Sequence, residues 1–203
     1  MLTIWGRLNS HNVKKVAWFA EELGLAYERH DVGGPFGMDA AYLARNPNAL
    51  IPTIDDDGFV LWESNVILRY LAARHGGERW WPADPARRAL IDRWMDWHFK
   101  FQEVQRPAFW GLVRTPEAER DMAAIDRAAA EAGRLMGILD DHLAGAAWLS
   151  GEKFGIGDIP MGMYAHTWFA LPIERPARPH VARWYAALRE RAAFRDMVMI
   201  PLT

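Results

Sequence analysis

The spacing of hydrophobic residues changes once along this chain of 203 residues, at a linker marked by Pro82 and Pro85. Before the linker, short strand-like runs alternate with helical segments, and after it only helical spacing recurs. A chain of this length supplies one large domain or two small ones. The change of pattern therefore predicts two domains: residues 1–77 with strands and helices, and residues 86–203 with helices alone.

The first part alternates two kinds of hydrophobic spacing. Its expected segments are a strand at 2–5, a helix from Asn12 to Gly24, a strand at 26–32, a short helix around 39–46, a hairpin at 52–64 and a helix at 63–76. The buried face of that last helix is expected to hold Val66, Ile67, Tyr70 and Leu71. This β-α-β-α-β-β-α order is that of a thioredoxin-like fold, an α/β domain followed here by an all-α part.

In the second part, the spacing of apolar residues predicts four helices and no strand. They are expected at about 86–105, 116–143, 158–169 and 179–190.

Composition excludes several classes of function. The net charge of -2 and a pI near 6.4 argue against binding to nucleic acid or to a membrane surface. The chain has no cysteine, so disulfides, thiolate metal sites and a protein-thiol nucleophile are excluded. Its start lacks the apolar run of a signal peptide and no stretch could span a bilayer, so we expect a cytoplasmic protein.

Three polar side chains crowd the start of the first helix. Asn9, Ser10 and Asn12 all suit a helix N-terminus, although one cap would suffice. They are either an ordinary start signal or a group that binds something.

Two further motifs suit a peptide-like ligand. Pro52 begins a strand, and a cis Ile51-Pro52 bond there would turn the Ile51 backbone outward as a free edge for a peptide. Ser64 is by default a helix cap. A helix N-terminus also binds a carboxylate, and the neighbouring Glu63 accepts from an ammonium group, which together suit an α-amino-acid end.

Four segments carry a family resemblance that covers the whole chain. They are "NSHNVKKVAWFAEELGLAYE", "NALIPTI", "WESNVILRYLA" and "FGIGDIPMG". Together they resemble the cytosolic glutathione transferases, especially bacterial theta-like members. The resemblance implies a glutathione-binding domain at 1–77, and a helical domain at 86–203 that forms the electrophile pocket and part of a dimer interface. It identifies "FGIGDI" as a helix-capping box, which we assign to folding.

The resemblance implies catalytic roles for two of the crowded side chains. Ser10 matches the serine that hydrogen-bonds the glutathione sulfur in theta-like enzymes. Asn12 matches an asparagine that approaches the sulfur in a disulfide-reductase-like group of the same superfamily. A free thiol has a pKa of about 8.5, and lowering it by about two units supplies about 2.7 kcal/mol of ionisation. Donated hydrogen bonds and the positive end of the first helix both favour the thiolate.

The resemblance also implies how the rest of glutathione is held. Ile51-Pro52 matches the cis-proline segment that pairs with the cysteinyl backbone, and Glu63-Ser64 matches the pair that holds the γ-glutamyl end. Many relatives carry Lys or Arg where this chain has Leu50, and that cation holds the glycyl carboxylate. Either another cation replaces it, or glutathione binds more weakly.

The electrophile pocket is expected in the helical domain. Its candidate residues are His98, Phe101, Trp110 and Trp168. Aromatic stripes at helical spacing are more often core or subunit interface, and His98 is more often a satisfied structural histidine than an acid or base.

The leading hypothesis is an enzyme that conjugates glutathione to a hydrophobic electrophile, with glutathione as co-substrate and no other cofactor or metal. Asn12 beside Ser10 also suits glutathione-dependent reduction of disulfides or peroxides. A non-catalytic interaction module with the same fold is the third hypothesis. Family members are usually homodimers, which the resemblance carries over. The sequence does not name the electrophile, because that pocket has no fixed motif.

Overall fold

The computed structural model describes all 203 residues and divides them into two compact units. Unit 1 comprises Met1–Asp84 and Ala192–Ile200, and unit 2 comprises Pro85–Arg191 and Pro201–Thr203. The break at residue 85 lies in the linker that the sequence predicts. The last helix differs from the expectation, because it packs with unit 1 rather than with residues 86–191.

Unit 1 is built on a four-stranded mixed sheet. Its strands are β1 (Leu2–Trp5), β2 (Tyr27–His30), β3 (Thr53–Asp56) and β4 (Phe59–Trp62), in the order β2-β1-β3-β4. β1 and β2 are parallel, and the other two pairs are antiparallel. The β3–β4 turn is tight because Asp57 and Gly58 both adopt positive φ, and the Gly58 N–H donates to the Asp55 carboxylate at 2.6 Å.

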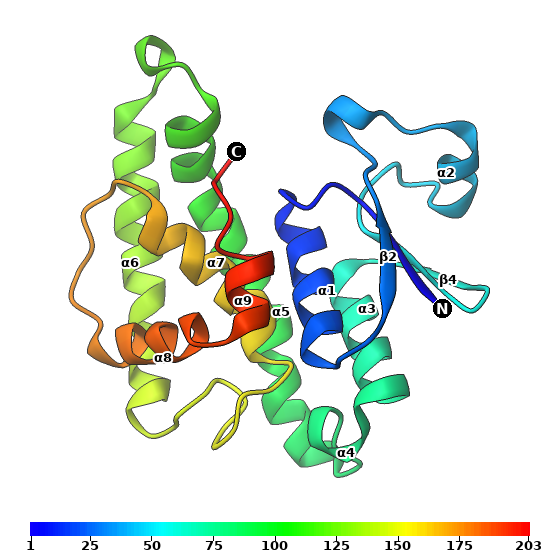
Figure 1. The fold of residues 1–203 in the computed structure, drawn as a ribbon. Coiled ribbons are helices and arrows are strands. Elements are labelled where there is room, and N and C mark those ends of the chain that lie inside the picture. The colour runs from blue at the N-terminus through cyan, green and yellow to red at the C-terminus, as the bar shows by residue number, and fades with distance from the viewer. The chain divides into compact units, whose positions relative to one another are not determined.

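Helices cover the sheet of unit 1 on both sides. They are α1 (His11–Glu22), α2 (Ala40–Arg45) and α3 (Ser64–Leu71), and the short α4 (Gly77–Trp80) follows α3 in the chain. Figure 1 shows α1 and α3 on the same side of the sheet, with α2 beyond the other side. This arrangement confirms the thioredoxin-like fold that the order of elements predicts.

The packed face of α3 differs from the one expected. Val66 is 43% exposed, whereas Leu68 is fully buried beside Ile67 and Leu71. Both choices satisfy a helical repeat, and the sequence does not show which side of the helix meets α1. Because α3 packs against α1, Leu68 rather than Val66 is buried.

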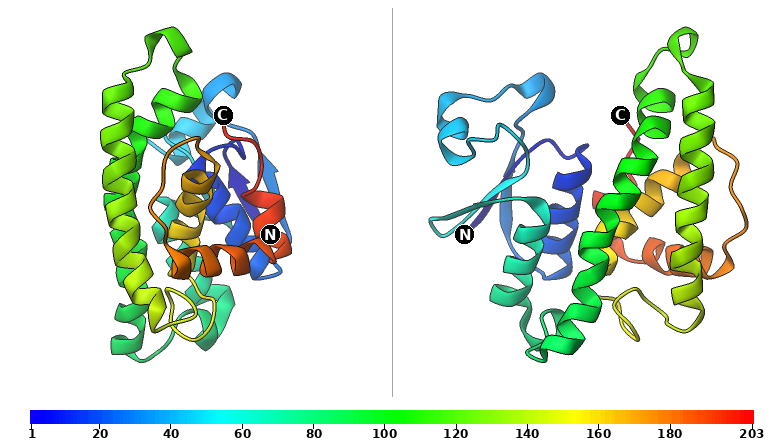
Figure 2. Two further views of the ribbon diagram at one scale, coloured as in Figure 1. Left: turned by 90° about the vertical axis from the view of Figure 1, so that its left-hand side faces the viewer. Right: turned by 180° about the vertical axis from the view of Figure 1, so that it is seen from behind.

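A ninth helix, α9 (Ala192–Met197), returns to α1 at the end of unit 1. Figure 2 shows this helix, in red, beside α1. Phe194 packs edge-on against Trp18 at 4.8 Å between ring centroids. The Lys14 ammonium donates to the Val198 carbonyl at 3.1 Å, just beyond the helix end. The sequence pattern did not predict this helix, because six residues are too few to show a period.

Unit 2 is entirely helical, as expected. Its helices are α5 (Pro85–Phe109), α6 (Met122–Ala144), α7 (Asp158–Ala170) and α8 (Pro179–Arg189). α6 begins later than predicted because the Asp121 side chain caps it by accepting from the Ala124 N–H at 2.9 Å. Every residue from Asp158 to Trp168 in α7 is buried. No helix is both long and apolar enough to cross a membrane.

Candidate functional site

Residues from three segments of unit 1 line one small pocket of about 70 Å³. The lining residues are Asn12, Asn46, Asn48, Leu50, Ile51, Pro52, Glu63 and Ser64. Five of the six residues implied as catalytic or glutathione-binding are therefore in one place, and Ser10 is not among them. The pocket is smaller than a typical small-molecule site.

Ser10 occupies the N-cap position of α1 without using its side chain as a cap. Its N–H donates to the Arg7 carbonyl at 3.1 Å, and its carbonyl accepts from the Lys14 N–H at 2.9 Å. The hydroxyl therefore remains available at the positive end of α1. Asn9 is engaged in the turn, where its side-chain oxygen accepts from the Arg7 guanidinium at 2.6 Å.

Asn12 joins the starts of two helices. Its side-chain oxygen accepts a hydrogen bond from the Ser64 hydroxyl at 3.3 Å. Because the oxygen of the amide is used, its NH₂ group is the part left to donate into the pocket. The bond lies at the N-termini of α1 and α3, where main-chain N–H groups and both helix dipoles favour an anion.

The Ile51-Pro52 peptide bond is cis. Neither the N–H nor the C=O of Ile51 has a partner within the chain. The preceding carbonyl, that of Leu50, is held by the Tyr42 hydroxyl and by the Asn46 amide at 2.9 Å. The main chain on one side of Ile51 is thus fixed, while the N–H and C=O of Ile51 itself make no hydrogen bond within the chain.

Tyr42 and Asn46 are supporting residues that the sequence analysis did not single out. The Tyr42 hydroxyl and the Asn46 amide also contact the Thr53 hydroxyl, at 2.9 and 3.1 Å. Burial raises the pKa of Tyr42, and the hydrogen bonds with Thr53 and Asn46 oppose that rise. Both side chains are buried, which is typical of groups that hold a binding loop, and Asn46 also lines the pocket.

Glu63 and Ala49 both adopt φ values that side chains with a Cβ rarely take. Glu63 has φ 73° and ψ 107°, and Ala49 has φ 53°. Such conformations cost of order 1–3 kcal/mol and gather at ligand sites. Glu63 lines the pocket, and its side chain does not cap α3. No lysine or arginine lines the pocket, and the Leu50 side chain is 61% exposed.

The four residues expected around an electrophile do not gather in one pocket of unit 2. His98 and Phe101 have no exposed surface, and the His98 ring packs against Tyr164 and bonds the Met95 carbonyl. Trp110 is 50% exposed, with the Arg114 guanidinium 4.6 Å from its ring. Trp168 lines a separate hollow of about 480 Å³ beside α8.

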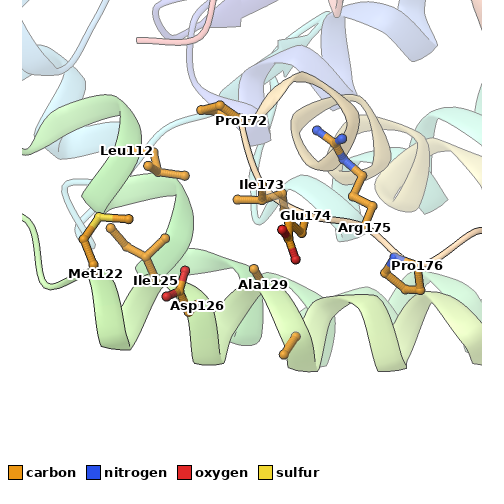
Figure 3. Close-up of a pocket in the computed structure, with 11 residues that line it drawn as sticks. Leu112, Met122, Ile125, Asp126, Ala129, Pro172, Ile173, Glu174, Arg175 and Pro176 are labelled. Carbon is orange, nitrogen blue, oxygen red and sulfur yellow. The ribbon is translucent and has the colours of Figure 1, made fainter.

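Unit 2 has a larger pocket that the sequence analysis did not foresee. It measures about 830 Å³ and lies between α6 and the loop that follows α7 (Figure 3). Its apolar lining comes mainly from Leu112, Met122, Ile125, Ala129, Pro172 and Ile173. Figure 3 shows the Arg175 guanidinium turned away from the Glu174 carboxylate. That guanidinium donates to the Trp168 and Phe169 carbonyls at the end of α7.

No group of three or more histidine, aspartate or glutamate side chains is placed to hold a metal ion.

Comparison with known proteins identifies both parts of the chain. Residues 9–74 match the model of the glutathione S-transferase N-terminal domain, and residues 100–192 match that of the C-terminal domain. The chain is 47% identical to glutathione S-transferase GstB of Escherichia coli (strain K12), over the full length of both proteins. It is 32% identical to glutathione S-transferase 3 of Zea mays, over 99% of this chain and 95% of that protein.

The same relationship holds for a solved structure. The theta class glutathione S-transferase of Xanthomonas axonopodis pv. citri, with glutathione bound, is 52% identical and superposes with a TM-score of 0.94. The match covers 100% of this chain and 99% of that one. The chain is therefore an enzyme of the glutathione S-transferase family.

Proposed function

We propose that this enzyme joins the sulfur of glutathione to a hydrophobic electrophile, with Ser10 as the main donor to the thiolate and Asn12 as a second. The observation that carries the proposal is the pocket of unit 1, where Asn12, Ile51 and the Glu63-Ser64 pair meet. The glutathione bound to the theta class relative, at 52% identity, supports the same ligand for this chain.

Each part of the pocket suits one part of the tripeptide. The Ile51 N–H and C=O pair with the cysteinyl backbone of glutathione. The α-carboxylate of the γ-glutamyl end binds the Ser64 N–H at the start of α3, and its ammonium binds the Glu63 carboxylate. With Leu50 in place of a cation, the glycyl carboxylate is held by polar groups of the loop, with Asn48 as the candidate in the lining.

The reaction itself requires little from the protein beyond a stable thiolate. The thiol loses its proton to solvent, and the Ser10 hydroxyl and Asn12 amide donate to the sulfur. A sulfur lone pair then forms the new C–S bond. With an aryl halide, the carbon–halogen bond breaks and the halide leaves with its electron pair. Ser10 acts as a donor and needs no base.

The remaining parts of the proposal concern unit 2 and the assembly. We place the electrophile against unit 2, with Trp110 and Trp168 as the aromatic candidates that have surface or a hollow beside them. The buried side chains of His98 and Phe101 then contribute to the core of unit 2 rather than to the electrophile site. The enzyme is proposed to be a homodimer in the cytoplasm, as its family resemblance implies.

Reduction of mixed disulfides or peroxides is a second candidate. The placement of the Asn12 amide in the pocket, with its oxygen already bonded to Ser64, favours it. In that reaction the thiolate attacks a disulfide sulfur, and the other sulfur leaves as a thiolate.

Calorimetric titration with glutathione tests the proposal first. We expect binding in the micromolar to millimolar range, and no binding at millimolar glutathione would overturn both candidates and favour a non-catalytic module. Conjugation of a chloro-dinitrobenzene and reduction of a glutathione mixed disulfide are then assayed side by side. Conjugation as the faster reaction supports the transferase, and disulfide reduction as the faster one supports the second candidate.

A further inference from the structure

Two adjacent lysines of α1 are buried in unit 1. Lys15 is 0% exposed and Lys14 is 1% exposed, although lysine is almost never fully buried unless it is paired. Their ammonium groups point to different partners. Lys14 bonds the Val198 carbonyl, whereas Lys15 bonds the side-chain oxygen of Asn65 at 3.1 Å.

The partner of Lys15 belongs to the first turn of α3. Asn65 is 3% exposed and directly follows Ser64, whose hydroxyl bonds Asn12. Asn12 and Lys15 are three residues apart and so share one face of α1. Two hydrogen bonds, Asn12–Ser64 and Lys15–Asn65, therefore tie this face to the start of α3.

Charge adds to this geometry. Burial lowers the pKa of Lys15 to about 7, and the nearby Glu63 carboxylate partly opposes that shift. Burial lowers the pKa of Lys14 only to about 8. Near neutral pH, Lys15 thus changes from charged to neutral directly behind the residues that line the pocket.

We infer that Lys15 is a positioning residue of the γ-glutamyl subsite, holding the first turn of α3 through Asn65 and supplying a positive charge that favours the ligand's α-carboxylate at Ser64. The inference rests on the proposed function, since it concerns the same pocket. It goes beyond that proposal because it makes glutathione affinity depend on pH through a group that never touches glutathione.

The sign of that dependence follows from the charge. A bound carboxylate stabilises the protonated form of Lys15, so binding is strongest where Lys15 is charged and weakens as the pH rises through about 7. We expect the affinity to fall by about fivefold between about pH 6 and pH 8, the lower end of the range typical of coupling between two binding events.

The other charged groups lie on α1 itself and on α3 and α9, the two helices that pack against it. On α1 itself they are Lys14 and His11, and at the start of α3 the acting charge is Glu63. Further along α3 stands Arg69, and on α9 the exposed pair Arg195 and Asp196. Lys14, whose pKa burial lowers to about 8, and the imidazole of His11 therefore each require a control of their own.

The experiment uses S-methylglutathione, whose sulfur cannot ionise, titrated calorimetrically across about pH 6 to 8 at constant ionic strength. The wild-type enzyme should lose affinity as the pH rises. Lys15→Met should bind weakly at all pH values without that trend, and Lys15→Arg should keep the low-pH affinity throughout. Steady-state kinetics should show a raised KM for glutathione in Lys15→Met with kcat nearly unchanged.

Two variants serve as matched controls. Lys14→Met removes an equally buried ammonium that faces α9, and His11→Gln removes the imidazole; both should retain the wild-type pH trend. A flat wild-type profile, a trend that persists in Lys15→Met, or a trend lost in either control would overturn the inference while leaving the proposed function intact. Failure of the wild-type enzyme to bind S-methylglutathione at any pH would instead overturn both.

Discussion

Asn12 of α1 and Ser64 of α3 share a hydrogen bond of 3.3 Å between side chains 52 positions apart in the chain. In the proposed site one of them faces the sulfur of glutathione and the other its γ-glutamyl end. The bond therefore links the two ends of the proposed site through helices that pack against each other.

A double-mutant cycle on this pair measures the coupling. Asn12→Ala, Ser64→Ala and the double variant are titrated with glutathione. We expect the two effects on binding to be non-additive by about 1 kcal/mol, the value of a neutral hydrogen bond between neighbours. Additive effects within experimental error would show that the two side chains act on glutathione independently.

Substitutions of Ser10 and Asn12 should affect the two candidate reactions to different extents. Ser10→Ala removes the hydroxyl that does not cap α1, and should lower conjugation of a chloro-dinitrobenzene by about 100-fold, as loss of one oxyanion donor does. The ultraviolet absorbance of bound thiolate should show a raised thiol pKa. Asn12→Ala should affect mixed-disulfide reduction more than conjugation. Unchanged conjugation in Ser10→Ala would rule out the donor role.

Ala49→Gly should stabilise the protein. Ala49 has φ 53°, a left-handed conformation that a Cβ disfavours by about 1 kcal/mol. The gain should appear as a higher midpoint of urea unfolding. Ala186→Gly, at an exposed interior position of α8, should instead cost about 1 kcal/mol. The same sign for both variants would contradict the conformational explanation.

Of the carboxylates in unit 2, Asp158 should lower the free energy of unfolding most when it is substituted. It is fully buried and accepts from the Leu149 and Gly155 N–H groups at 2.7 and 3.0 Å, and from the Trp184 indole at 2.9 Å. Burial raises its pKa, and these hydrogen bonds oppose the rise. Asp158→Ala leaves several buried donors without an acceptor and should cost about 3 kcal/mol.

Asp126→Ala is the matched control for this prediction. Asp126 lies on the exposed face of α6, and its removal should change the free energy of unfolding by less than about 0.5 kcal/mol. Equal urea midpoints for the two variants would show that the Asp158 network contributes nothing to stability.

Asp56 should contribute to stability in a pH-dependent way. Burial acts to raise its pKa, but hydrogen bonds from His75 at 2.7 Å and Tyr70 at 2.9 Å outweigh burial, so the pKa lies below its usual value. The stabilisation is present above the unfolded-state pKa of about 3.9 and is lost as the pH falls through the lower folded-state value.

Urea unfolding at several pH values tests this sign. Asp56→Asn should be less stable than the wild type at neutral pH by about 1 kcal/mol, with the difference shrinking toward about pH 3. A difference that stays constant across this range would assign the effect to packing instead.

The sequence alone predicted the elements of both units closely. The spacing of apolar residues located the hairpin and the long helices. Burial of one face of a strand or helix imposes a period on the apolar residues, and this period is visible in the sequence. The motifs around Ser10, Pro52 and Ser64 also marked where glutathione was expected, since caps and turns use a few residue types at fixed offsets.

Only the tertiary structure decided which side chains meet. In the sequence, Lys15 looks like an ordinary charged residue of a helix. It is buried because α1 packs against Asn65, which lies 50 positions further along the chain. The same holds for the choice of Leu68 over Val66 and for the return of α9 to α1. A local period records how each helix is amphipathic, whereas the partner of each face depends on long-range packing that no window of the sequence contains.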